Sequence, residues 1–218
     1  MTTQTPRGDT RARIVDIALE LFAEHGYEKT SLREIADRLG VTKAALYYHF
    51  RTKEDILAGI VDAMAAPIEE TIAWGEQQPY SPQLRDEIIR RFAQGMADRQ
   101  RLLRFFHENQ PTIRELSAGT RFKDRMIALT RLMQGPEPTF EDRVRSAVSL
   151  LVINVTNFIA DDQRNCGAHG DSGQADGTHG DSAHDAAADP VEAEKDRQAV
   201  ALRVALDVAE RIGKPAQS

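Results

Sequence analysis

Apolar residues recur every three to four positions along most of the chain, and this spacing places them on one face of a helix. The first such stretch, residues 10–24, carries Ile14, Ile17 and Leu21 at this spacing. Glycine, proline and capping residues separate the stretches from one another. The resulting helices are expected at residues 10–24, 31–39, 42–49, 53–75, 81–97, 99–108, 111–134, 139–160 and 190–212. Since no segment shows the alternation of a strand, the pattern predicts an all-α protein with about nine helices.

Two of the helix starts carry specific signals. Ser31 and Glu34 have the spacing of a capping box, in which the hydroxyl accepts from the Glu34 amide and the carboxylate reaches back. Ser81 precedes a proline at the first helical position, where the missing amide proton costs least. Inside the predicted helix 53–75, Pro67 removes one backbone hydrogen bond, so a bend is expected there.

The stretch between the last two predicted helices, residues 161–189, has a different composition. It is rich in aspartate, glycine and small residues, and His-Gly-Asp-Ser occurs at 169–172 and again at 179–182. Because it has no large apolar residue, burial cannot offset the entropy of ordering it, and we predict a mobile loop. Its histidines could bind a divalent metal, but a glycine-rich loop is not preorganised for one, so no metal site is predicted.

Composition favours an ordinary globular protein. Of the 218 residues, 41% are hydrophobic, which is enough for a core. The chain has no apolar run long enough to span a membrane and no apolar stretch near Met1 of the kind that signals secretion. The single cysteine, Cys166, cannot form an internal disulfide. Together these features lead us to expect a cytoplasmic protein.

The net charge of −6 is unevenly distributed along the chain. Residues 1–53 hold nine basic and seven acidic residues, a net charge of +2, whereas the remainder carries −8. A mildly basic head on an acidic body suits phosphate binding at one end only.

Three helices in the first 50 residues, with a tight Gly40-Val41 turn between the second and third, are typical of a helix-turn-helix, whose later helix enters the DNA major groove. The segment Thr30–Phe50, TSLREIADRLGVTKAALYYHF, followed by Lys53, resembles the signature of the tetracycline-repressor (TetR) family of bacterial regulators. About 45 contiguous residues, starting at Ile14, fit the family without a gap.

The resemblance implies roles for individual residues of the head. Contacts to the DNA backbone are implied for Thr30, Thr42, Tyr47, Tyr48, His49 and Lys53. Their donors suit phosphate oxygens, which only accept hydrogen bonds. Lys43 and Ala44 would read base edges, and Arg33 would reach phosphate or a base edge. Alternatives stay open: the tyrosines could be packing residues, His49 could cap its short helix, and Lys53 could be a solvated helix start.

For the rest of the chain, the resemblance implies a DNA-binding domain at residues 1–53 and a ligand-binding and dimerisation domain at 54–218. The homodimer would form through the helices near 139–160 and 190–212. Their apolar stripes comprise Val144, Ala147, Leu151, Val155, Val200, Val204, Leu206 and Val208. Alternatively, these stripes face the core of a single subunit. The implied function is a ligand-responsive repressor that binds a palindromic operator as a dimer.

A small, largely apolar effector is expected to bind in the body, since aromatic and methionine side chains suit an adaptable pocket. The candidate lining residues are Trp74, Phe92, Met96, Phe105, Phe106, His107, Phe122, Met126, Asn154 and Asn157. The apolar members could equally be core residues, and the asparagines could bond between helices.

Enzymatic activity is not expected. The sequence shows no clustered carboxylates, metal motif or nucleophile–base pair, so we predict no catalytic residue and no cofactor. Two alternatives stay open: an all-α enzyme with an apolar pocket, and a DNA-binding protein that activates transcription or organises the chromosome.

Overall fold

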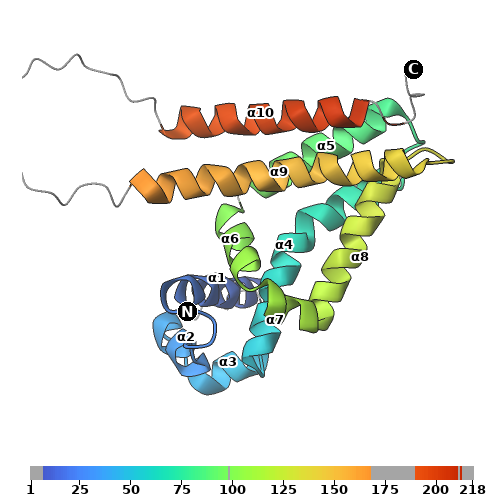
Figure 1. Cartoon of the computed structure of the whole chain (residues 1–218). Coiled ribbons are helices and arrows are strands. Elements are labelled where there is room, and N and C mark those ends of the chain that lie inside the picture. The colour runs from blue at the N-terminus through green and yellow to red at the C-terminus, as the bar shows by residue number, and fades with distance from the viewer. Residues whose placement is uncertain (1–6, 98, 168–189, 211, 213–218) are drawn as a thin grey trace, which may run out of the picture. The chain divides into compact units, whose positions relative to one another are not determined.

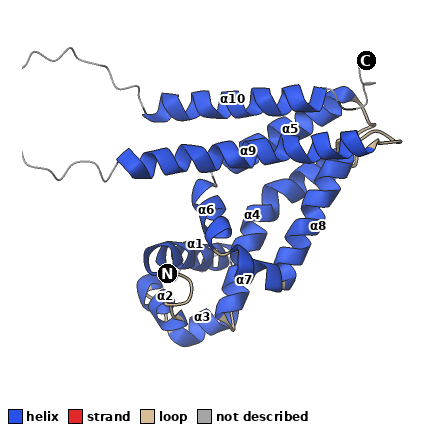
Figure 2. Ribbon diagram, viewed as in Figure 1, coloured by secondary structure: helices blue, strands red, loops and turns tan. Residues whose placement is uncertain are grey.

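The computed structural model describes residues 7–97, 99–167, 190–210 and 212, with side chains described at 10–97, 99–155, 195–210 and 212. All regular structure in these residues is α-helical, as predicted (Figure 2). The helices are α1 (Arg7–His25), α2 (Leu32–Leu39), α3 (Lys43–His49), α4 (Lys53–Gly75), α5 (Pro82–Ala97), α6 (Gln100–Glu108), α7 (Gln110–Glu115), α8 (Ser117–Leu132), α9 (Phe140–Gly167) and α10 (Pro190–Glu210), labelled in Figure 1. None of the described helices is long and apolar enough to cross a membrane.

The chain divides into two compact units. The first comprises Met1–Gln77 and Arg101–Leu129, and so contains α1 to α4, α7 and most of α6 and α8. The second comprises Gln78–Gln100 and Thr130–Ser218, with α5, α9 and α10. The predicted domains, residues 1–53 and 54–218, are defined by their expected functions and not by compactness. This division therefore stays a prediction.

The start and end of α2 follow from local chemistry. The capping box is present: the Glu34 amide donates to the Ser31 hydroxyl at 3.2 Å, and the Ser31 amide donates to the Glu34 carboxylate at 2.7 Å. At the other end, Gly40 has a φ of 69°, a left-handed conformation that glycine adopts at little cost. This glycine reverses the chain within two residues and directs it into α3.

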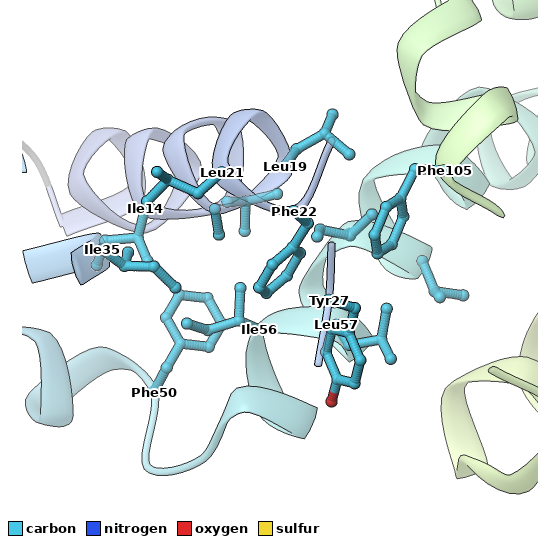
Figure 3. Packing of buried hydrophobic residues seen from close by; sticks show 14 of the residues in the cluster. Ile14, Leu19, Leu21, Phe22, Tyr27, Ile35, Phe50, Ile56, Leu57 and Phe105 are labelled. Carbon is cyan, nitrogen blue, oxygen red and sulfur yellow. The ribbon is translucent and has the colours of Figure 1, made fainter. Parts of the chain in front are cut away.

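The core of the first unit lies where α1, α2, α3 and α4 meet (Figure 3). Ile14, Ile35 and Phe50 are almost completely buried there, so side chains from three segments converge on one cluster. A methyl group added at Gly59 would lie 3.1 Å from Val15 and 3.2 Å from Phe50. Glycine at this position therefore lets α4 approach α1 closely.

Two predicted helix boundaries are wrong. The single helix expected at 111–134 is two helices, because Leu116 has an extended backbone (φ −85°, ψ 147°) that ends α7 before α8 begins. The helix expected to end at residue 160 continues to Gly167, since the intervening polar residues include no proline or glycine to stop it. The remainder of the predicted loop, residues 168–189, lies outside the described residues.

In the second unit, α9 and α10 run side by side, with α5 packed against them (Figure 1). The contact face of α10 carries Ala201, Ala205 and Ala209, which are buried and spaced one turn apart. On α9, Ser146 and Ser149 are fully buried, and their hydroxyls donate to their own helix's carbonyl oxygens. Small side chains on both helices permit close packing, and the two serine hydroxyls are satisfied within α9.

Candidate nucleic-acid interface

Helix α3 is anchored on one side and exposed on the other. Thr42 caps it by accepting a hydrogen bond from the Ala45 amide at 3.2 Å, and Leu46 is fully buried against the core. Lys43 and Ala44, the two predicted base readers, are both exposed at the start of this helix. The arrangement leaves an amino group and a methyl group facing solvent on a rigidly held helix.

Tyr47 and Tyr48 also lie on the exposed side of α3. The Tyr48 side chain is 71% exposed, so a packing role does not account for it. Tyr47 is less exposed, and the Lys43 ammonium lies 5.4 Å from the centre of its ring. His49 is half-buried and sits edge-on to Tyr48, with ring centroids 5.2 Å apart. The exposed face of α3 thus carries both hydrogen-bond donors, which can contact phosphates and base edges, and apolar groups, which can contact thymine methyls.

Thr30 is placed differently from the sequence expectation. Its side chain is buried, at 2% exposure, and its hydroxyl lies 2.9 Å from the Gly26 carbonyl oxygen and 3.2 Å from that of Leu21. The hydroxyl is therefore placed to donate to a backbone carbonyl oxygen near the end of α1. The buried Thr30 side chain is therefore not exposed for the phosphate contact that the resemblance implies.

Lys53 begins α4 but is not a solvated helix start. Its ammonium donates to the carbonyl oxygens of Tyr27 at 2.8 Å and Glu28 at 3.2 Å, and only 19% of its side chain is exposed. It also lies 4.3 Å from the centre of the Tyr27 ring. Lys53 thus braces the turn between α1 and α2, with the Glu28 carboxylate 3.8 Å away.

Tyr27, which receives this contact, remains a neutral phenol. Burial, which is the largest cause, and the negative charges of Glu54 and Glu28 together raise its pKa to about 12. Its hydroxyl has no hydrogen-bond partner among the described residues. The ring also packs edge-on against Phe22 at 5.1 Å, which ties this turn to the core.

Arg11 lies beside the candidate interface, although no local pattern in the sequence marks it. Its guanidinium lies 4.2 Å from the centre of the Phe50 ring and donates to the His49 carbonyl oxygen at 3.4 Å. It thereby brings a positive charge to the C-terminal end of α3, where the helix dipole favours cations. Arg33, by contrast, is exposed on α2 and pairs with Asp37 at 3.7 Å.

The predicted effector-binding residues are distributed over both units. Phe92 and Met96 are buried in the second unit, and Phe105 lies in the core of the first, stacked on Phe22 at 5.6 Å. Trp74 is half-buried near the end of α4, and His107 is exposed. None of these five residues lines either of the two cavities described below.

The two asparagines lie on α9. The Asn154 side-chain oxygen is buried and has no hydrogen-bond partner among the described residues. The side chain of Asn157 lies outside the described residues. The predicted contribution of both to an effector site stays untested.

Three of the candidates do come together. Phe106, Phe122 and Met126 line a cavity of about 570 Å³ formed by α6, α7 and α8, all within the first unit. A second cavity of about 640 Å³ lies in the second unit, beside the segment 135–138, and is lined by none of the candidates. Buried Arg85 faces that cavity and is neutralised by Asp86 at 2.9 Å.

Comparison with known proteins agrees with the geometry of the head. The family model "Bacterial regulatory proteins, tetR family" matches residues 14–60. The transcriptional regulator AcrR of Shigella flexneri is 41% identical over 68 residues, which cover 31% of this chain and 32% of AcrR. The transcriptional repressor KstR2 of Rhodococcus jostii is 39% identical over 83 residues, covering 34% of this chain and 41% of KstR2. The matches thus span less than half of these relatives.

Solved structures extend the likeness of the fold to the whole chain. A TetR-family regulator from Syntrophomonas wolfei superposes with a TM-score of 0.63 over 97% of this chain and 99% of its own, at 17% identity. A TetR-like regulator from Rhodococcus sp. gives 0.61 over 95% and 97%, at 14% identity. Residues 14–60 therefore match the tetR-family head, and the chain shares the fold of these solved regulators.

Proposed function

We propose that the protein is a ligand-responsive repressor that binds a palindromic operator as a dimer. One observation carries the DNA-binding part: α3 is fixed to the core by Leu46 while Lys43, Ala44 and Tyr48 project into solvent. A rigid helix with a donor and a methyl group at its start can read base edges in the major groove.

Each exposed group of the interface has a chemical role in this proposal. Lys43 donates to guanine O6 or N7, and the Ala44 methyl packs against a thymine methyl. Hydroxyl, imidazole and guanidinium groups flank these readers and donate to phosphate oxygens. The proposed phosphate contacts are Thr42, Tyr47, Tyr48, His49, Arg11 and Arg33. Lys53 acts mainly by bracing the turn that supports α2.

The proposed dimer forms through one exposed apolar face of α9 and α10. Val144, Leu151 and Val155 on α9 are exposed, as are Val200 and Val204 on α10. Five exposed branched apolar side chains on two adjacent helices are unusual for a surface that meets only water. A two-fold axis through this face would give two copies of α3 for two operator half-sites.

The proposed effector is a small, largely apolar molecule that favours the form of the dimer unable to bind the operator. Such coupling needs only about 1–3 kcal/mol of differential affinity. Neither catalysis nor a cofactor is part of this proposal, so the protein is proposed to be a regulator and not an enzyme. The proposed place of action is the cytoplasm.

Selection of bound duplexes from a random pool tests the DNA-binding part with the full chain. We expect enrichment of a palindrome whose half-sites are centred about 10 base pairs apart, or slightly more. The matched control is the double variant Lys43→Ala/Tyr48→Ala, which should enrich nothing while keeping its helical content, because both side chains are exposed. Enrichment of an asymmetric site, or of none, would refute the proposal.

A further inference from the structure

The cavity between α6, α7 and α8 has an apolar floor. Phe106 comes from α6 and Phe122 and Met126 from α8, with the two phenyl centroids 4.8 Å apart. Ile113 of α7 closes the base and is almost completely buried. At about 570 Å³, the cavity lies within the range of about 300–1,000 Å³ that small-molecule sites occupy.

The rim of the same cavity is basic and polar. Arg114 and Lys123 line it, whereas no acidic side chain does so among the described residues. Neither cation has a hydrogen-bond or ion-pair partner in the described part of the chain. The side chains of Gln110 and Thr120, also on the rim, are likewise available as donors. The lining thus combines an apolar interior with two positive charges at its edge.

The cavity lies where the helical backbone is interrupted between α7 and α8. A methyl group added at Gly119 would lie 2.1 Å from the Ile113 carbonyl oxygen, so only glycine lets the first turn of α8 approach the end of α7 this closely. The extended residue Leu116 separates the two helices at this point. The cavity therefore lies at a specific junction of α7 and α8.

We propose that this cavity binds an amphipathic carboxylate, with its apolar part against Phe106, Phe122 and Met126 and its carboxylate at Arg114 and Lys123. Charge complementarity selects the anion, because hydrogen bonds to charged groups are stronger than neutral ones. As the effector site of a repressor, this assignment rests on the proposed function, but binding of the carboxylate itself does not.

The cavity is joined to the DNA-binding head through packed aromatic side chains. Phe105, next to Phe106 on α6, stacks on Phe22 of α1, and Phe22 packs edge-on against Tyr27 (Figure 3). Ile113 belongs both to the cavity floor and to the core cluster of the head. A ligand that displaces α6 or α7 would therefore act directly on α1 and on the turn that supports α2.

Calorimetric titration of the full chain with decanoate, decanol and decylamine tests the proposal, since these probes share a chain length and differ in charge. We expect decanoate to bind with a stoichiometry of one per chain and about tenfold more tightly than decanol, with decylamine weakest. In the double variant Arg114→Gln/Lys123→Gln, decanoate should lose this tenfold advantage while decanol binds as before. Both changed side chains are exposed, so folding should be unaffected.

The matched control is Arg131→Gln/Lys195→Gln, which removes the same charge from exposed positions outside the cavity. It should bind decanoate as the unchanged protein does. Equal affinity for decanoate and decanol, equal loss in both double variants, or no binding of any probe would each overturn the assignment. The titration contains no DNA, so its failure leaves the operator-binding proposal standing, and failure of operator selection leaves this site standing.

Discussion

The ammonium of Lys53 lies over the ring of Tyr27, 4.3 Å from its centre, and donates to that residue's carbonyl oxygen at 2.8 Å. One side chain thereby fixes both the ring and the backbone of the turn between α1 and α2. The same ring packs against Phe22, so Lys53 acts on the core of the head from the first residue of α4.

Replacing Lys53 should therefore affect stability more than phosphate binding. We expect Lys53→Met to lower the free energy of unfolding by about 1–2 kcal/mol, because a cation–π contact and charged hydrogen bonds are lost. Chemical denaturation measures this change. Lys29→Met, at an exposed position, should stay within about 0.5 kcal/mol of the unchanged protein.

The salt dependence of operator binding separates this role from phosphate contact. Since backbone carbonyls already accept from the Lys53 ammonium, Lys53→Met should change the slope of log K against log salt by less than about one unit. A fall of a full unit would mean that Lys53 also neutralises a phosphate.

Lys43 and Tyr48 should be separable by their effect on base preference. We expect Lys43→Ala to reduce discrimination at one operator position by about 1–3 kcal/mol, because a bidentate contact to guanine is lost. Tyr48→Phe should instead weaken binding to all duplexes similarly, since a phosphate contact carries no sequence information. Binding to a panel of single-base operator variants measures both. An unaltered preference in Lys43→Ala would exclude Lys43 from base reading.

The capping box of α2 should make part of the stability depend on pH. The hydrogen bond from the Ser31 backbone, and to a smaller extent the one from its hydroxyl, hold the pKa of the Glu34 carboxyl below that of an ordinary glutamate. A carboxylate with a lowered folded-state pKa stabilises the fold above the unfolded pKa, and this stabilisation is lost as the pH falls through the folded value.

The variant Glu34→Gln should accordingly lose less stability than the unchanged protein as the pH falls below about 4.5. Denaturation midpoints measured across that range test this expectation. Glu70→Gln provides the control, since Glu70 is exposed and takes part in no capping box. Parallel acid profiles for Glu34→Gln and the unchanged protein would contradict the assigned role.

The apolar face of α9 and α10 should determine the oligomeric state. Leu151 is 56% exposed in the single chain, so Leu151→Arg should place a charge in the proposed interface and give a monomer. Light scattering at micromolar concentration reports the mass. Gln83→Arg, on the exposed side of α5, should leave the dimer intact. A monomeric unchanged protein would remove the interface from the proposal.

Features set by neighbouring residues were predictable from the sequence. The capping box of Ser31 and Glu34 and the turn at Gly40 involve residues within a few positions of one another, and both occur as expected. The all-helical class and most helix bounds likewise follow from local spacing. The break at Leu116 is one exception, because Gly119 approaches Ile113 closely there and no periodicity shows this.

Contacts between distant residues were not predictable in the same way. Thr30 turns inward because the end of α1 offers it carbonyl oxygens, and Lys53 reaches back 26 residues to Tyr27. Arg11 meets His49 across 38 residues. For the effector candidates, residue type alone could not distinguish core members such as Phe105 from those that line the cavity, such as Phe106.

Trp74, half-buried near the end of α4, is the single tryptophan of the sequence. Its indole emission therefore reports on one position of the first unit without any label, since no second indole contributes to the signal. Titrations with decanoate or with operator DNA can be followed by this intrinsic fluorescence. A shift of the emission maximum would show that the surroundings of Trp74, near the end of α4, change when that ligand binds.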